Sequence, residues 1–139
     1  MQIRHYLAAL ALMFAATAAP ACDIVDDAIA RQVLGTDFLG DAPDPATFCK
    51  YVSAENFTLF FAKKEPAEKY EKGTLTTPPS AESIGERARS YRLPGNAGWA
   101  LHFVADGYFY ELTVQTVMPG DDTDYLPRLR AAAEAVLAR

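Results

Sequence analysis

Trp99-Ala-Leu-His-Phe-Val-Ala-Asp-Gly-Tyr-Phe-Tyr-Glu-Leu-Thr-Val-Gln115 is the stretch of this 139-residue chain that decides its fold. Two short runs rich in apolar and aromatic residues flank Asp106-Gly107, a dipeptide that suits a two-residue type I′ turn between right-twisted strands. We therefore predict an antiparallel hairpin whose turn sets the register. One face of the hairpin should be core, with these facing pairs: Ala105 with Tyr108, Phe103 with Tyr110, Leu101 with Leu112, and Trp99 with Val114.

The opposite face of this hairpin holds the candidate binding surface, made of His102, Val104, Phe109 and Glu111. The register places Val104 against Phe109 and His102 against Glu111. Exposed aromatic and aliphatic groups beside charges suit a recognition patch. The alternative is that a helix or loop covers this face.

His102 opposite Glu111 is the only pair downstream of residue 21 that resembles a catalytic or metal-binding combination. A carboxylate can orient an imidazole and raise its pKa. A zinc site needs three or four ligands, and the rest of the sequence offers no second histidine there. A cross-strand ion pair is therefore the favoured interpretation, and we predict no metal, no cofactor and no catalytic residue.

A helix and a second hairpin come first along the chain after the leader. Residues 26–35 predict a short helix with Asp26 as N-cap and Gly35 at its left-handed end. Residues 36–47 contain Gly, Asp and Pro and predict an irregular connection. Cys49–Ser53 and Phe57–Lys63 then predict a second hairpin around a turn at Asn56. Its register pairs Ser53 with Phe57, Tyr51 with Leu59, and Cys49 with Phe61.

The remaining elements complete an α+β domain. Residues 66–72 predict a charged and solvated two-turn helix, and residues 74–83 a loop. Residues 86–93 favour a strand, although a short helix from Ser80 is an alternative. Asp124 as N-cap and Pro127 in the first turn predict a C-terminal helix. We expect an antiparallel sheet of about five strands with N-terminal, short middle and C-terminal helices, in the order helix, two strands, helix, three strands, helix.

The first 21 residues predict a signal peptide, with a basic start, an apolar run of leader length and a small-x-small site at Ala19-Pro20-Ala21. We therefore expect residues 22–139 to form a single domain in the periplasm or outside the cell. The apolar run is too short to span a bilayer, and no second candidate follows. A lipid anchor at Cys22 is not expected, because Ala19 stands where lipoprotein signals usually carry a residue like leucine.

Cys22 and Cys49 are the two cysteines of the chain. In an exported protein they most simply pair, and the closed loop would stabilise the fold by about 3.5 kcal/mol in the chain-entropy model. The alternative is a reactive cysteine nucleophile, which would need a base, and only His102 could serve downstream of the leader.

Charge narrows the possible partners. Twelve basic and 18 acidic residues remain after the leader, which contains Arg4 and no acid, so the net charge is −6. That balance disfavours nucleic acid and anionic lipid. The acidic run at residues 121–124 fits helix capping better than a calcium loop. Arg87, Arg89 and Arg92 around Tyr91 could bind an anion, but such residues more often solvate one face of a strand.

Four stretches carry a family resemblance: residues 22–35, Phe48-Cys-Lys-Tyr51, Ile84-Gly-Glu-Arg-Ala88 and the hairpin of residues 99–115. In this order they resemble small exported bacterial envelope proteins of unknown function with a PsbP-like fold. The resemblance implies a disulfide-tethered helix before an antiparallel sheet, a C-terminal helix over the sheet, and a binding or accessory role. It supplies no catalytic residues.

From these observations we expect a non-enzymatic binding or accessory protein of the bacterial envelope, whose partner is an envelope protein or a small ligand. No motif of a serine hydrolase, phosphate loop or zinc protease is present. One alternative is a secreted hydrolase that uses His102 and carboxylates around one pocket. Another is a structural subunit or protein inhibitor with a large exposed apolar patch.

Overall fold

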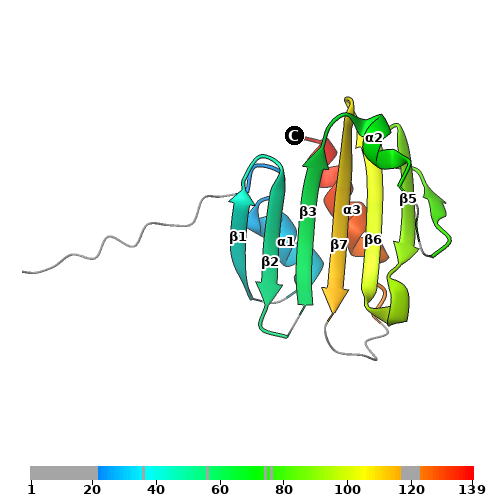
Figure 1. Cartoon of the computed structure of the whole chain (residues 1–139). Helices are drawn as coiled ribbons and strands as arrows, with labels where there is room; N and C mark the ends of the chain where they lie inside the picture. Colours follow the sequence, from blue (N-terminus) through cyan, green and yellow to red (C-terminus); the bar gives the residue numbers. More distant parts are fainter. Residues whose placement is uncertain (1–21, 36, 56, 74, 76, 117–122) are drawn as a thin grey trace, which may run out of the picture.

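The computed structural model describes residues 22–35, 37–55, 57–73, 75, 77–116 and 123–139. The predicted signal peptide, the turn residue Asn56 and the acidic residues Asp121 and Asp122 lie outside this set. The described chain is α+β, with a seven-stranded antiparallel sheet in the order β1-β2-β3-β7-β6-β5-β4 (Figure 1). None of its helices is long and apolar enough to cross a membrane.

The elements follow one another along the chain as helix, three strands, helix, four strands and helix, with one short 3-10 turn before β6. Their bounds are α1 Asp27–Leu34, β1 Phe38–Asp44, β2 Phe48–Ser53, β3 Phe57–Lys64, α2 Ala67–Glu71, β4 Ser80–Glu82, β5 Arg87–Arg92, η1 Pro94–Asn96, β6 Gly98–Ala105, β7 Tyr108–Thr116 and α3 Leu126–Leu137.

The sheet consists of two meanders joined edge to edge. Strands β1 to β3 form the first and β4 to β7 the second, and β3 pairs with β7 along its whole length, from Phe57 opposite Thr116 to Lys64 opposite Phe109. The expectation of about five strands was wrong, because β1 and β4 form where the composition predicts loops.

The hairpin of β6 and β7 confirms the predicted register at every pair, from Trp99 opposite Val114 to Ala105 opposite Tyr108. Its turn residues Asp106 and Gly107 both have positive φ, 52° and 80°. These are the left-handed conformations that a type I′ turn requires. The β2–β3 hairpin also has the predicted register, with Tyr51 opposite Leu59.

Strand β1 is a correction to the predicted irregular connection at residues 36–47. Leu39 pairs with Val52 and Gly40 with Tyr51, and the register shifts between Asp41 and Asp44. Pro43 is tolerated because β1 is an edge strand, where a missing backbone donor costs no ladder hydrogen bond. Composition pointed to a loop, whereas the free edge of β2 supplied the pairing partner.

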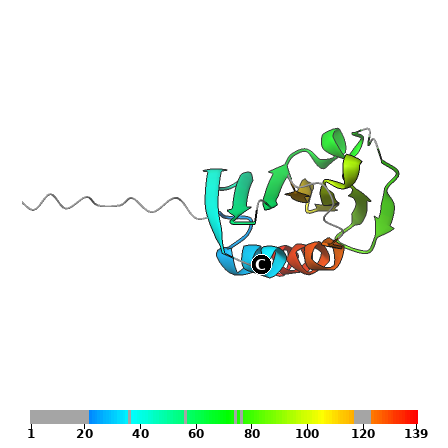
Figure 2. The same cartoon turned by 90° about the horizontal axis from the view of Figure 1, so that it is seen from below.

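Helices α1 and α3 lie side by side on one face of the sheet (Figure 2). α1 has the predicted caps: Asp26 accepts a hydrogen bond from the Ile29 amide at 2.9 Å, and Gly35 is left-handed. Cys22 and Cys49 form the predicted disulfide, which ties the start of the described chain to β2. The core between helices and sheet includes Val25, Val33, Leu59, Phe61, Leu101, Phe103, Leu112, Val114 and Leu129.

The N-cap of α3 lies one residue later than expected. Asp124 does accept a hydrogen bond from the Leu126 amide at 3.0 Å, but Tyr125 occupies the N-cap position. Pro127 stands in the first turn as predicted. Arg139, just after α3, forms an ion pair with Asp26, the N-cap of α1. This pair links the end of α3 to the start of α1.

Two expectations around the second meander also need correction. Residues 74–83 are not all loop, because Ser80–Glu82 forms the short edge strand β4 on β5. β5 confirms the predicted strand at residues 86–93, and the alternative helix from Ser80 was wrong. α2 forms where the residues 66–72 helix was expected, yet it is not simply solvated, since Ala67 is only 1% exposed.

Candidate functional site

The face of the sheet opposite α1 and α3 is here called the open face. The strand registers align its side chains around His102 in three neighbouring rows across the strands. The middle row contains Arg89 of β5, His102 of β6, Glu111 of β7 and Ala62 of β3, which follow from the strand registers. The rows on either side hold Arg87, Val104, Phe109 and Lys64, and Tyr91, Ala100, Thr113 and Phe60.

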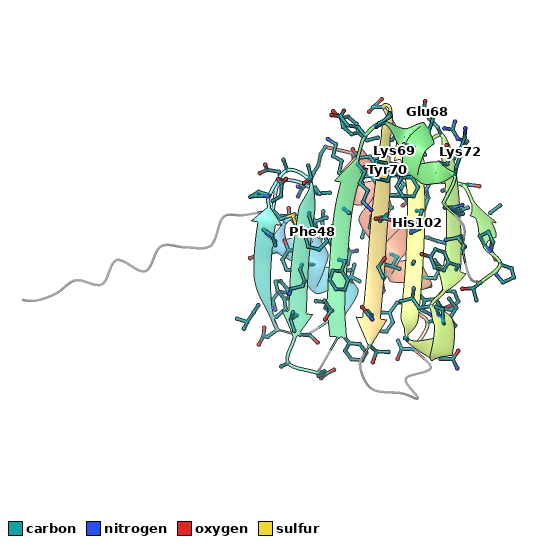
Figure 3. All side chains as sticks on the ribbon, viewed as in Figure 1. Phe48, Glu68, Lys69, Tyr70, Lys72 and His102 are labelled. Carbon is teal, nitrogen blue, oxygen red and sulfur yellow. A yellow bond between two sulfur atoms is a disulfide. The ribbon has the colours of Figure 1, made fainter. Side chains whose placement is uncertain are left out.

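His102 lies in the middle of the open face (Figure 3), and it is only 5% exposed. Its Nε2 lies 3.3 Å from the hydroxyl of Tyr91 and 3.8 Å from Oε1 of Glu111. Nδ1 is buried without a hydrogen-bond partner among the described residues. Burial lowers the pKa of His102 to about 4, and the opposing attraction of Glu111 does not offset it. The ring is therefore neutral at pH 7.

Glu111 forms its ion pair with a different residue from the one expected. Its Oε2 accepts a hydrogen bond from Nζ of Lys64 on β3 at 2.5 Å. The predicted ion pair between His102 and Glu111 is thus replaced by a lysine–glutamate pair beside a neutral histidine. Burial and then Glu111 raise the pKa of Tyr91, whose hydroxyl lies near the same ring nitrogen, so its phenol remains protonated.

α2 covers one end of the predicted binding surface. Val104 and Phe109 are 2% and 3% exposed, and they form a small apolar cluster with Ala67. The Tyr70 ring stacks on Phe109 with centroids 6.4 Å apart. The structure therefore brings the four predicted residues together, but the apolar pair is buried under a helix rather than exposed. The alternative of a covered face applies at this end.

A pocket of about 260 Å³ lies beside this cluster, between α2, β5 and β6. Three of the four predicted residues contribute to it, while Glu111 does not. Its lining combines apolar groups with ionisable ones: Glu71, Arg87, Ala88, Arg89, His102, Phe103, Val104 and Phe109.

The three arginines of the predicted anion cluster have different environments. Arg87 binds both carboxylate oxygens of Glu71, at 2.5 and 3.0 Å. This hydrogen bond from Arg87 lowers the pKa of Glu71. Arg92 lies on the other face of β5, with its guanidinium 5.2 Å from the ring centre of Trp99. The cluster does not converge, because residues 87 and 92 of a strand point to opposite faces.

Arg89 is the remaining arginine, and it lies directly beside His102 across the β5–β6 pair. Its Nε is buried without a hydrogen-bond partner, and among the described residues no carboxylate forms an ion pair with it. Arg89 also borders a neighbouring hollow lined by Gly73, Leu75, Thr77, Pro78 and Pro79.

Sequence reasoning missed Glu71 and Lys64 as members of this site, and it named Tyr91 with the arginines without placing it beside His102. Arg87, Arg89 and Tyr91 alternate along β5, which signals a shared face. The missing step was the pairing of β5 with β6, because the turn signal Pro94-Gly95-Asn96 between them was not used to set a register. Without that register the arginines could not be placed beside His102.

Comparison with protein-family models, with curated proteins and with solved structures finds no match to this chain. Within the described part of the chain, no group of three or more His, Cys, Asp or Glu side chains is arranged to hold a metal ion.

Proposed function

We propose that this protein is a non-enzymatic binding domain that takes a small ligand in the pocket between α2, β5 and β6. One observation carries the proposal: polar atoms of His102 and Arg89 are buried beside this pocket without hydrogen-bond partners. Buried polar groups are nearly always paired, so an orphan beside a cavity indicates a missing partner. Pockets for drug-sized ligands have volumes of about 300 Å³ or more, so the smaller volume of this pocket favours a smaller molecule.

Binding is a better account of this pocket than hydrolysis. A general acid must be protonated near neutral pH. The pocket carboxylate, Glu71, has a lowered pKa because Arg87 holds it, so it stays ionised. Glu111, the carboxylate nearest His102, is already paired with Lys64. The hydrolase alternative requires two carboxylates that are free to act with His102.

An extracytoplasmic setting is part of the proposal. The Cys22–Cys49 disulfide favours an oxidising compartment, where such bonds persist. The resemblance to exported envelope proteins with a PsbP-like fold implies the same setting and a binding or accessory role. We infer from these two lines that the domain works in the periplasm or outside the cell.

Nuclear magnetic resonance can test the ligand pocket directly. The full chain is labelled with ¹⁵N in an exporting bacterial host and titrated with benzoate, benzamide, benzyl alcohol and benzylamine, probes of one size and different charge. We expect at least one probe to shift the amide signals of Ala88, His102 and Val104 while those of α1 stay fixed. If every probe leaves these three amides unmoved up to millimolar concentration, the pocket function is wrong.

A second candidate function, docking of a partner protein, rests on a different part of the open face. Leu39 on β1 is 81% exposed and its pairing partner Val52 is 39% exposed. Exposed apolar groups on an edge strand are a common feature of protein contacts. Sedimentation velocity of the wild-type chain and of Leu39→Ser distinguishes this case, since a contact through Leu39 should give a larger species that the variant loses.

A further inference from the structure

We propose that the pocket binds the carboxylate of a small monocarboxylic acid on Arg89, an inference that rests on the proposed ligand-binding function. The guanidinium of arginine holds a carboxylate through two parallel hydrogen bonds. The other cation that lines the pocket, Arg87, already has a carboxylate partner in Glu71, and Lys64 on β3 has Glu111. Arg89 alone among these three has none in the described structure.

The charges around the pocket favour a ligand with a single negative charge. Among the residues that line the pocket, Arg87 and Glu71 form a neutral pair and His102 is neutral at pH 7, while Glu86, which lies 3.8 Å from Arg87, is not part of the lining. Arg89 is therefore the lining residue whose positive charge has no carboxylate ion-pair partner among the described residues. A monocarboxylate neutralises that charge, whereas a phosphate dianion would leave one negative charge near Glu71 and Glu111.

The rest of the lining suits an organic acid rather than an inorganic anion. Val104 and Phe109 contribute to the pocket wall, and both belong to the apolar cluster under α2. Such a wall favours a hydrocarbon chain or ring attached to the carboxylate. His102 adds a polar edge, and its Nδ1 lacks a partner among the described residues.

The experiment compares each acid with its uncharged amide of nearly the same shape. The full chain is titrated with acetate, benzoate, acetamide, benzamide and inorganic phosphate, and dissociation constants are read from the amide shifts of His102 and Val104. The Arg89 side-chain Nε signal provides a second readout. We expect benzoate to bind more tightly than benzamide and to move the Arg89 signal.

Variants then test the role of Arg89. Loss of a charged hydrogen-bond partner should weaken benzoate binding about ten- to hundredfold in Arg89→Gln, with benzamide little changed. Arg89→Lys keeps the positive charge but loses the two parallel hydrogen bonds of a guanidinium, so its affinity for benzoate should lie between those of the wild type and Arg89→Gln. Arg31→Gln removes the same charge from an exposed pair with Asp37 on the far side and should bind like wild type. The wild-type Nε signal decides the question even if Arg89→Gln does not fold.

The outcomes separate this inference from the broader proposal. If benzamide binds the pocket as tightly as benzoate, or if phosphate binds more tightly, the monocarboxylate assignment is wrong while a ligand pocket remains. Shifts that gather on Leu75 and Thr77 would place the ligand in the neighbouring hollow and overturn the site. If no probe of either class binds, both proposals fail.

Discussion

Nε2 of His102 lies 3.8 Å from Oε1 of Glu111, yet His102 is neutral at pH 7 because burial lowers its pKa to about 4. The attraction of Glu111 acts in the opposite direction and is the weaker effect. Arg89 and Lys64 add to the lowering, since both place positive charge near the ring. The cross-strand ion pair expected from the register is therefore a contact between a carboxylate and an uncharged imidazole.

The stability of the protein should fall as pH decreases from about 6.5 to about 5. His102 takes up a proton near pH 6.5 in the unfolded chain but only near pH 4 when folded, so the unfolded state binds more protons in this window. The free energy of unfolding then rises with pH and levels off above pH 6.5, with a full span of up to about 3 kcal/mol. Urea unfolding at several pH values measures it.

The matched variant for this pH effect is His102→Gln, which keeps a polar side chain without a titrating ring. Glu71 and Glu82 have lowered pKa values and stay ionised in the folded protein, so they add only a small slope near pH 5, where carboxyl groups of the unfolded chain begin to take up protons. We expect a nearly flat profile between about pH 5 and 6.5 in the variant. A folded-state ring titration of His102 at or above pH 6.5, seen by NMR, would contradict the neutral assignment.

Removal of the disulfide should destabilise the domain without changing its fold. Cys22 and Cys49 are 27 residues apart, and the loop-closure model assigns the bond about 3.5 kcal/mol. The double variant Cys22→Ala with Cys49→Ala avoids burying an unsatisfied thiol or hydroxyl group in the core. Thermal unfolding of this variant and of reduced wild type should agree, and equal stability to the oxidised protein would show that the bond contributes nothing.

Two glycines of the β6–β7 hairpin should respond very differently to substitution. At Gly98, where φ is 125°, an added Cβ would lie 1.9 Å from the carbonyl oxygen of Val114. Gly98→Ala should therefore cost about 2–4 kcal/mol through clash and strain. Gly107 also has positive φ, but an added Cβ would meet nothing within 4 Å, so Gly107→Asn should cost less than about 1 kcal/mol. Chemical unfolding compares the two, and equal losses would refute the close approach at Gly98.

α2 should depend on Tyr70 for its attachment to the sheet. The ring stacks on Phe109 at 6.4 Å, so Tyr70→Ala removes an aromatic pair worth about 0.5–1.5 kcal/mol beyond the lost burial. We expect faster hydrogen exchange at the amide of Ala67, which donates to the Gly107 carbonyl. Exchange in Tyr70→Ala that matches wild type would show that α2 is held by other contacts. Lys72→Ala is the control, since Lys72 is exposed.

Local patterns predicted the parts of the fold that local chemistry controls. Asp106-Gly107 set the β6–β7 register, Asp26 and Gly35 set the ends of α1, and these predictions are confirmed. β1 was missed because its pairing with β2 depends on a partner outside its own sequence. The same holds for the position of α2, whose charged residues predicted a solvated helix.

The amino-acid sequence by itself determined which residues of β6 and β7 share a face, because a two-residue turn and the alternation of side chains leave no other register. It thereby placed His102 and Glu111 side by side. Only the tertiary structure decided what surrounds them. α2 buries Val104 and Phe109. Lys64 forms an ion pair with Glu111, and the pairing of β5 with β6 places Arg89 beside His102. These contacts join segments distant along the chain, and their free energy depends on burial and charge that no local pattern specifies.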